Sequence, residues 1–358
     1  MAHGAGLGLL AWAWLGLGMA CNGYTAHPLR LGDETSDSDT ATAMEPDTAV
    51  PMDTESSSES ESSAPDTAPD DVDDTLADTT PEPLPRIVAV ANLHGDLNAA
   101  RRALTTAQVL DENDQWIGDD TIVVQLGDIL DYGTEELALI DFMLSVRQAA
   151  QAAGGDVVLL WGNHEFMAVQ GNFRYLTEAN CAAYRDYPLL DTDQAPLAEL
   201  SDPDCRMRGA ALLPGGPVAR LLATFPAALV LGDLVFVHGG ILSAHLEQPL
   251  SAHNAEIAAW ARGELAAPHA AVHDMLWDRT YSDNKVAALS DEVCDELQAV
   301  LDSIGARTMV VAHSRFEHIN AACHGAVWRI DTGLAAYFSG HMEVLEIDNG
   351  TFSVLYAP

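Results

Sequence analysis

Five short turns of this sequence carry the residue types that hold metal ions and move protons. Each turn follows a run of apolar residues, and together the turns span more than two hundred residues of chain. In an open α/β sheet, ligands gather at the carboxyl ends of the strands, so we expect these turns to meet in one crevice. They read ANLHGD (91–96), LGDILDYG (126–133), WGNHE (161–165), VHGG (237–240) and VAHS (311–314).

The side chains of these turns suit divalent metal chemistry. Asp, Asn and His offer oxygen and imidazole ligands for Mn, Fe or Zn, and the absence of Cys from all five turns disfavours a structural zinc site. Two such ions that share a carboxylate and a water would generate hydroxide at neutral pH and hold a phosphoryl group for in-line attack. The turns therefore predict phosphoester hydrolysis.

Each turn taken alone also has a purely structural interpretation. Asp128 or Asp131 could cap a helix that begins near Thr134, and His238 could be a hydrogen-bonded core histidine followed by an ordinary Gly-Gly turn. The occurrence of all five turns in this order favours the functional interpretation.

The elements that position these turns alternate between strand and helix patterns. From Arg86, short β-branched runs such as RIVAVAN, TIVVQLGD and DVVLLWGN alternate with the amphipathic stretches LNAARRALTTAQVL and EELALIDFMLSVRQAAQAA. This order is typical of βαβ units with parallel strands. Later runs predict a hairpin around Gly232-Asp233, a buried strand in TMVVAHSRF and a second hairpin at Asn349-Gly350. Residues 166–216 lack strand signals and predict an insertion that covers or shapes the site.

The five turns, together with GNHEFMAVQGNFRYL and MLWDRTYS, resemble those of calcineurin-like metallophosphoesterases. The resemblance lies within the phosphoprotein phosphatase family, in the branch of Shewanella-like phosphatases, and it covers about Arg86 to Tyr356. It implies an α/β fold built as a four-layer α/β/β/α sandwich, which agrees with the mixed pattern of strands and helices. We expect this domain to span residues 85–358.

The resemblance also implies a role for each polar residue of the turns. A bridging Asp128 would join two divalent ions, and a hydroxide between the ions would attack phosphorus without a phosphoenzyme. His164 would be the general acid that protonates the leaving oxygen, and Asp131 would orient it. The first ion would be held by Asn92, His94 and Asp128, and the second by Asp128, Asn163, His238 and His313.

Two positions depart from the family pattern. Asn92 stands where the family has Asp, so we expect the first ion to bind weakly, and Tyr132 stands where GDxxDRG has a phosphate-binding Arg. A neutral hydroxyl can donate one hydrogen bond to phosphate but does not replace a bidentate cation. Arg279 in LWDRTY matches another phosphate-contacting arginine of the branch, and Arg174 in NFRYL is a candidate helper.

The composition separates an N-terminal region from the folded part. Residues 33–82 contain no Lys, Arg or aromatic residue and are rich in Ser, Thr, Pro, Asp and Glu, so residues 22–84 are predicted to be a disordered acidic tether. The formal net charge is -38, and Lys285 is the only lysine. This charge argues against a nucleic-acid partner, because phosphate backbones are bound by clustered Lys and Arg.

The first residues predict export. The apolar run GLGLLAWAWLGLGMAC has the length of a signal-peptide core and is short for a membrane span. Residues 1–21 therefore resemble a bacterial lipoprotein signal, in which Cys21 becomes the lipidated first residue, although no Lys or Arg precedes the run. We expect a periplasmic or outer-membrane-anchored lipoprotein that meets the membrane through its lipid only and is a monomer.

Export bears on the four remaining cysteines, because thiols in an oxidising compartment tend to pair. Sequence proximity favours Cys181 with Cys205, which leaves Cys294 with Cys323. The alternative is four buried thiols that pack as small apolar side chains.

Three functions remain open at this point. The leading hypothesis is a phosphomonoesterase or protein phosphatase that acts on phosphoproteins or small phosphoesters. A second is a module with weakened chemistry that binds a phosphorylated ligand, and a third is a nucleotide or dinucleoside polyphosphate hydrolase, which the absence of Lys-rich patches disfavours. These residues do not identify the substrate or the metal, because such ligand sets accept several divalent ions.

Overall fold

The computed structural model describes residues 84–188, 190–286 and 288–357. The predicted signal segment, Cys21 and all of the predicted tether except Leu84 lie outside the described residues. Within the described ranges, no helix combines the length and the apolar character that a membrane crossing requires.

The first third of the described chain forms the predicted βαβ units. Strands β1 (Ile87–Val90), β2 (Ile122–Gln125) and β3 (Asp156–Leu159) are parallel neighbours, joined by helices α1 (Leu97–Thr106) and α2 (Glu136–Ala153). The strands are short and almost wholly buried, which explains their continuous apolar runs. Each strand therefore delivers its following turn to the same edge of the sheet.

Two C-terminal strands complete this first sheet. Strand β9 (Glu343–Asp348) lies antiparallel to β1 and pairs with β10 (Thr351–Tyr356), so the strand order is β10-β9-β1-β2-β3. Asn349 and Gly350 join β9 to β10 with φ values of 48° and 72°. These positive angles are those of a tight hairpin turn, as the Asn-Gly pair predicts.

A second five-stranded sheet has the order β4-β5-β6-β8-β7. Its central strands β5, β6 and β8 are parallel, while β4 and β7 run antiparallel at the two edges. The Gly232-Asp233 turn joins β4 to β5 as predicted. The bounds are β4 (Ala228–Leu231), β5 (Leu234–Val237), β6 (Thr308–Val311), β7 (Asn320–Ala322) and β8 (Val327–Arg329).

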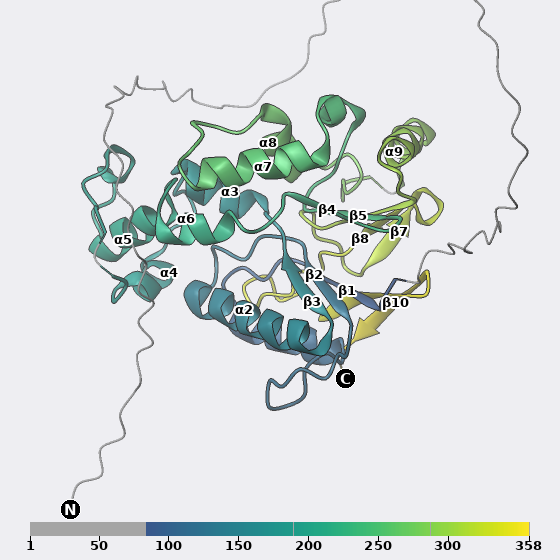
Figure 1. The fold of residues 1–358 in the computed structure, drawn as a ribbon, viewed down its shortest axis with the longest axis horizontal. Coiled ribbons are helices and arrows are strands. Elements are labelled where there is room, and N and C mark those ends of the chain that lie inside the picture. Colours follow the sequence, from purple (N-terminus) through teal and green to yellow (C-terminus); the bar gives the residue numbers. More distant parts are fainter. Residues whose placement is uncertain (1–83, 189, 287, 358) are drawn as a thin grey trace, which may run out of the picture. The chain divides into compact units, whose positions relative to one another are not determined.

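The two sheets pack against each other and helices cover their outer faces (Figure 1). One apolar core joins Val124 of the first sheet with Phe236 and Val310 of the second. A separate core lies between the second sheet and α9 (Asp291–Ile304), where Leu297 is fully buried. The arrangement is the four-layer α/β/β/α sandwich that the resemblance implies.

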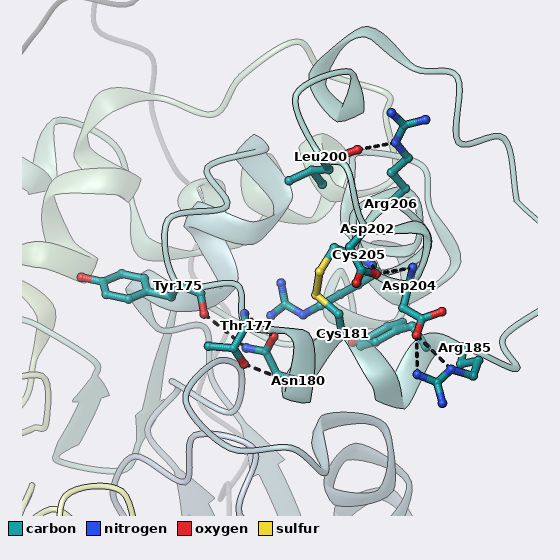
Figure 2. The surroundings of a disulfide bond; sticks show 12 residues. Tyr175, Thr177, Asn180, Cys181, Arg185, Leu200, Asp202, Asp204, Cys205 and Arg206 are labelled. Atoms are coloured by element: carbon teal, nitrogen blue, oxygen red, sulfur yellow. Dashed lines mark hydrogen bonds and ion pairs between the residues drawn. A yellow bond between two sulfur atoms is a disulfide. The ribbon is translucent and has the colours of Figure 1, made fainter.

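The segment between β3 and β4 is helical and contains no strand among its described residues. Helix α4 (Glu178–Cys181) is joined to α5 (Pro203–Leu212) by a disulfide between Cys181 and Cys205 (Figure 2). A second disulfide joins Cys294 of α9 to Cys323. These are the two pairs that sequence proximity favours. The remaining helices are α3 (Asn163–Gln170), α6 (Pro217–Leu222), α7 (Leu250–Ala261) and α8 (Ala270–Trp277).

Candidate active site

The predicted ligands meet at the carboxyl ends of five strands that belong to the two sheets. The turns after β1, β2 and β3 come from the first sheet, and those after β5 and β6 come from the second. A cavity of about 290 Å³ opens at this point. Its lining includes the predicted site residues Asn92, His94, Asp128, Tyr132, Asn163, His164, Arg279 and His313, together with Tyr175, Asn284, Arg315, Asp331 and Phe338.

Asp128 occupies the centre of the cluster. Its Oδ2 atom lies 3.8 Å from His94 Nε2, 3.2 Å from His238 Nε2 and 3.1 Å from Asn92 Nδ2. The Asp128 side chain is almost wholly buried. Its carboxylate lies within 4.8 Å of potential ligand atoms of His94 and His164 on one side of the cluster, and of His238 and His313 on the other. The position fits a carboxylate that bridges two cations. It does not cap the helix expected near Thr134, since α2 begins at Glu136, but its Oδ1 accepts the backbone N–H of His164 in the first turn of α3 at 3.0 Å.

The atoms around Asn163 are arranged for a cation. The inward amide atom of its side chain lies 3.0 Å from His238 Nε2 and 3.2 Å from Asp128 Oδ2, while His238 Nε2 lies 3.2 Å from His313 Nδ1. His238 Nδ1 lies 2.7 Å from the Leu126 carbonyl, so in the neutral ring that nitrogen is the donor and Nε2 is a lone pair. As a nitrogen, the inward amide atom donates to Asp128 and His238; as an oxygen, it faces acceptors, an arrangement that a metal ion would satisfy directly.

Asn92 completes the other half of the cluster. Its side chain is 4% exposed, and its Nδ2 donates to Asp128 while, among the described residues, its Oδ1 has no hydrogen-bond partner. An orphaned, buried amide oxygen beside a carboxylate and an imidazole is a potential cation ligand. His94 fits the same role, because its Nδ1 lies 3.0 Å from the Leu130 carbonyl and its Nε2 faces Asp128. The residues present thus fit two divalent ions, with Asn92 supplying a neutral oxygen.

The pKa values of two of the three predicted imidazole ligands agree with ligand roles. Burial lowers the pKa of His94 to about 4 and that of His313 to about 2, so both rings are neutral at physiological pH. Burial also opposes charging of His238, but the nearby Asp128 outweighs burial and raises its pKa. Neutral imidazole is the form that coordinates metal, so an ion at His238 would displace the proton that Asp128 favours there.

Glu165 joins, through hydrogen bonds, the two turns that carry Asp128 and Asn163. Its buried carboxylate accepts hydrogen bonds from the backbone N–H groups of Asp128, Ile129, Leu130 and Gly162 at 2.8–2.9 Å. The turns also approach closely, since a Cβ on Gly127 would lie 2.3 Å from the Gly162 nitrogen. The glutamate of GNHE is therefore structural, a role that we did not assign from the sequence.

His164 and Asp131 form the predicted acid pair. His164 Nδ1 lies 2.7 Å from Asp131 Oδ2, and both side chains are nearly buried. Burial opposes the charged forms of both groups. The carboxylates of Asp128 and Asp131 nevertheless raise the pKa of His164, and the contacts with His164 and Arg208 lower that of Asp131. Because His164 lines the cavity and its Nδ1 contacts Asp131, the protonated ring can donate a proton from Nε2.

The three predicted phosphate contacts differ in position. Arg279 lines the cavity and donates from Nη1 to Ser314 Oγ at 2.7 Å, and Tyr132 also lines it. Arg174 is exposed, is absent from the cavity lining, and places its guanidinium 5.0 Å from the ring centroid of Tyr175. Arg315 lines the cavity instead, 4.6 Å from the Phe338 ring, so the structure brings a cation to the site that the sequence analysis missed.

Aromatic rings surround Tyr132 at the mouth of the cavity. Its ring centroid lies 4.5 Å from Tyr337, 5.0 Å from Phe338 and 5.2 Å from Tyr175, and Tyr175 lies 4.7 Å from the ring of His164. The residue that replaces the family's arginine thus joins an aromatic wall. Tyr337 and Phe338 belong to a loop more than two hundred residues further along the chain, and no local pattern links them to Tyr132.

The backbone is strained where the site residues sit. Non-glycine residues rarely adopt positive φ, and such conformations gather at functional sites. The affected site residues are His94 (44°), Asp128 (56°), Asp131 (66°), Tyr132 (61°) and His313 (52°). Seven further non-glycine residues of the described chain have positive φ outside these turns, so the strain is shared by the site and by ordinary tight turns.

Two further charged residues near the site were missed from the sequence. Arg208 is 1% exposed and pairs with Asp131, although it lies in the insertion with no motif to mark it. Asp331 lines the cavity, and burial raises its pKa to about 6 against the Gly333 N–H hydrogen bond, with Asp128 adding to the rise. The only sequence signal for Asp331 is its place after the strand run VWRI.

Comparison with known proteins identifies the family. The profile of the family described as calcineurin-like phosphoesterase matches residues 85–342. Shewanella-like protein phosphatase 2 of Arabidopsis thaliana is 35% identical over 308 residues, which cover 76% of this chain and 78% of that protein. Shewanella-like protein phosphatase 1 of Plasmodium berghei is 25% identical over 270 residues, which cover 70% of this chain and 68% of that protein.

A solved structure shares the fold. The cold-active protein-tyrosine phosphatase of a psychrophilic Shewanella species superposes with a TM-score of 0.57 at 22% identity, covering 76% of this chain and 80% of that one. The site geometry, the family profile and the curated relatives agree. The chain therefore belongs to the calcineurin-like phosphoesterase family and is a metal-dependent phosphatase similar to the Shewanella-like protein phosphatases.

Proposed function

We propose that this protein is a phosphomonoesterase of phosphoproteins that uses two divalent ions and His164 as its general acid. The observation that carries the proposal is the convergence of the potential ligand side chains of Asn92, His94, Asn163 and His238 on the carboxylate of Asp128, beside the His164–Asp131 pair. The ions, when bound, would supply Lewis acidity and neutralise phosphate charge. Manganese is the ion that we propose to test first.

The protein's own residues position the phosphoester and move the proton. Arg279 and Arg315 line the cavity and offer guanidinium groups to the equatorial phosphate oxygens. His164 holds a proton on Nε2 and delivers it to the leaving oxygen as the P–O bond breaks, while Asp131 keeps its Nδ1 proton in place. No side chain needs to form a covalent bond to phosphorus.

We further propose that aryl phosphates, phosphotyrosine among them, are the preferred substrates. Tyr132, Tyr175 and Phe338 line the cavity, and Tyr337 beside them is 65% exposed. Rings in this arrangement offer edge and face contacts to an aromatic leaving group. The solved relative is also named a protein-tyrosine phosphatase. Turnover of phosphotyrosine and phosphoserine forms of one peptide measures this preference.

The function is tested with His164→Asn and an aryl phosphate in added Mn²⁺. Removal of a positioned general acid costs on the order of 10² to 10⁴ in rate, so kcat should fall by that factor while the bound metal is unchanged. A parental protein that binds a phosphorylated peptide without turnover at any metal concentration would instead support the binding-module alternative.

We also propose that the protein is exported and anchored by lipid on Cys21. The proposal rests on the apolar run that ends at this cysteine and on the acidic tether that follows it. The multiple acyl chains of a lipoprotein hold a protein at a membrane, whereas a single chain binds only marginally. Mass spectrometry of the mature N-terminus tests the proposal, and an intact Met1 or an unmodified Cys21 in the soluble fraction would contradict it.

A further inference from the structure

A buried arginine stands directly behind the acid pair. Arg208, on α5, is 1% exposed and donates from Nη2 to Asp131 Oδ1 at 2.9 Å and to Glu136 Oε1 at 2.7 Å. Its Nε donates to Glu136 Oε2 at 2.8 Å. The guanidinium therefore binds Glu136 through two nitrogens and donates one further hydrogen bond to Asp131.

The two oxygens of Asp131 have different partners. Oδ2 contacts His164 Nδ1 at 2.7 Å, and Oδ1 contacts Arg208. Glu136 Oε1 also accepts the Asp131 backbone N–H at 2.8 Å. Rotation of the Asp131 carboxylate would break one of these contacts, so the arginine fixes the plane of the carboxylate and, through it, the imidazole ring of His164.

The geometry depends on a guanidinium rather than on positive charge alone. The planar guanidinium donates two hydrogen bonds to Glu136, and one of the same nitrogens also donates to Asp131. A lysine ammonium is a point charge and cannot fix the directions of both carboxylates. Tyr184 supports the arrangement, because its hydroxyl donates to Glu136 Oε2 at 3.1 Å. The network supplies partners for both buried carboxylates, so its cation cannot be removed without an uncompensated charge.

Arg208 reaches the site from the insertion. It lies one helical turn beyond Cys205, whose disulfide to Cys181 joins α5 to α4 (Figure 2). Close packing also holds the helix, since a Cβ on Gly209 would lie 2.4 Å from a Leu197 side-chain carbon. The insertion thus delivers one buried cation to the catalytic pair.

We propose that Arg208 is a positioning residue of the phosphatase reaction, which holds Asp131 so that His164 points its acidic nitrogen at the leaving oxygen. The inference rests on the proposed function, in which His164 is the acid. If Arg208 were purely structural, its substitution would lower stability and reduce kcat equally for all substrates. If Arg208 is a positioning residue, its substitution reduces kcat most for substrates whose leaving group most needs protonation.

The test is a leaving-group series of aryl phosphates at saturating Mn²⁺, from p-nitrophenyl phosphate to phenyl phosphate. A poor leaving group needs the acid more than a good one. With Arg208→Met we expect kcat to fall about 10-fold to 100-fold on phenyl phosphate and less than about 3-fold on p-nitrophenyl phosphate. Arg208→Lys should lie between the parent and Arg208→Met. The matched control is Arg185→Met, an exposed arginine of the same insertion, which should leave the series unchanged.

A double-mutant cycle separates positioning from general damage. In the His164→Asn background, Arg208→Met should add less than about 3-fold, because the group through which it acts is gone. If Arg208→Met unfolds on account of the unpaired Glu136, the Glu136→Gln/Arg208→Met variant removes both charges and carries the same expectations. Metal content and the midpoint of thermal unfolding are recorded for each variant.

Two results would overturn the inference. One is an equal loss of kcat across the leaving-group series, and the other is an undiminished loss in the His164→Asn background. Failure of the proposed function gives a different result. Either the parent shows no turnover, or His164→Asn retains the parental rate on phenyl phosphate, whatever the activity of Arg208→Met.

Discussion

The three central histidines of the site differ in what their Nδ1 atoms contact. His94 and His238 place Nδ1 against backbone carbonyls of Leu130 and Leu126, whereas His164 places it against the carboxylate of Asp131. A carbonyl fixes the tautomer and leaves a neutral nitrogen for a metal, while a carboxylate favours the charged ring. We therefore expect ligand roles for His94 and His238 and an acid role for His164, with the raised pKa of His238 showing that the nearby Asp128 also acts on the ring.

The pH dependence follows from the same contact. Because Asp128 and Asp131 outweigh burial and raise the pKa of His164 above 6.5, the protonated acid is present below that pKa and is lost as pH rises through it. In Asp131→Asn the pKa of His164 should fall, so the descending limb of kcat against pH should move to lower pH. Rate profiles at saturating Mn²⁺ measure the shift, and an unmoved or upward-shifted limb would contradict it.

We expect Asn92 to weaken binding of the first metal ion. Asp128 is the only carboxylate among the six predicted ligands, so two dications would share one negative charge. Asn92→Asp should tighten the first site and lower the Mn²⁺ concentration for half-maximal activity by about 10-fold or more, which corresponds to roughly 1.4 kcal/mol. Calorimetric titration gives the affinities. Asn113→Asp, which adds the same charge on an exposed turn, is the control. Equal Mn²⁺ affinities in the parent and in Asn92→Asp would contradict the prediction that Asn92 weakens the first metal site.

At the scale of elements, the local patterns identified the strands and helices that carry the site. The β-branched runs before Asn92 and Asp128 became parallel strands, and the Asn349-Gly350 turn became a hairpin. The five turns converged because carboxyl ends of parallel strands share one edge. The partners of Asp131 were not predictable in this way, because Arg208 meets it across 77 residues through packing of a helical insertion without motif or period.

The disulfide between α4 and α5 should stabilise the insertion. A cross-link of this kind reduces the entropy of the unfolded chain, and typical contributions are about 2–4 kcal/mol. The Cys181→Ser/Cys205→Ser variant, whose parent bridge spans 24 residues, should lose free energy of unfolding on that scale in denaturant titrations. Cys294→Ser/Cys323→Ser removes the other bridge and tests whether any effect on activity is specific to the insertion. An unchanged unfolding midpoint in the first variant would contradict the prediction.

At the scale of the molecule, the site joins the two sheets. Asp128 and Asn163 follow strands of the first sheet, whereas His238 and His313 follow strands of the second, and all four meet within hydrogen-bond distances. The predicted ligand set therefore spans the interface of the sandwich. An ion bound there would contact both halves of the fold, so metal binding and global stability should be linked.

This linkage has a measurable size. A ligand that binds only the folded state stabilises it by RT ln(1 + [L]/Kd), about 2.7 kcal/mol at one hundred times Kd. The midpoint of thermal unfolding should therefore rise with added Mn²⁺ and fall in chelator. In His313→Ala the dependence on Mn²⁺ should shrink, since the ring contributes Nδ1 to the cluster of the second sheet. His273→Ala removes an exposed imidazole outside the cluster and should keep the parental dependence. Identical midpoints in chelator and in Mn²⁺ for the parent would mean that no ion joins the sheets. The polar atoms at the interface would then be satisfied within the protein, by a proton on His238, whose pKa Asp128 raises, and by an Asn163 amide that donates to Asp128.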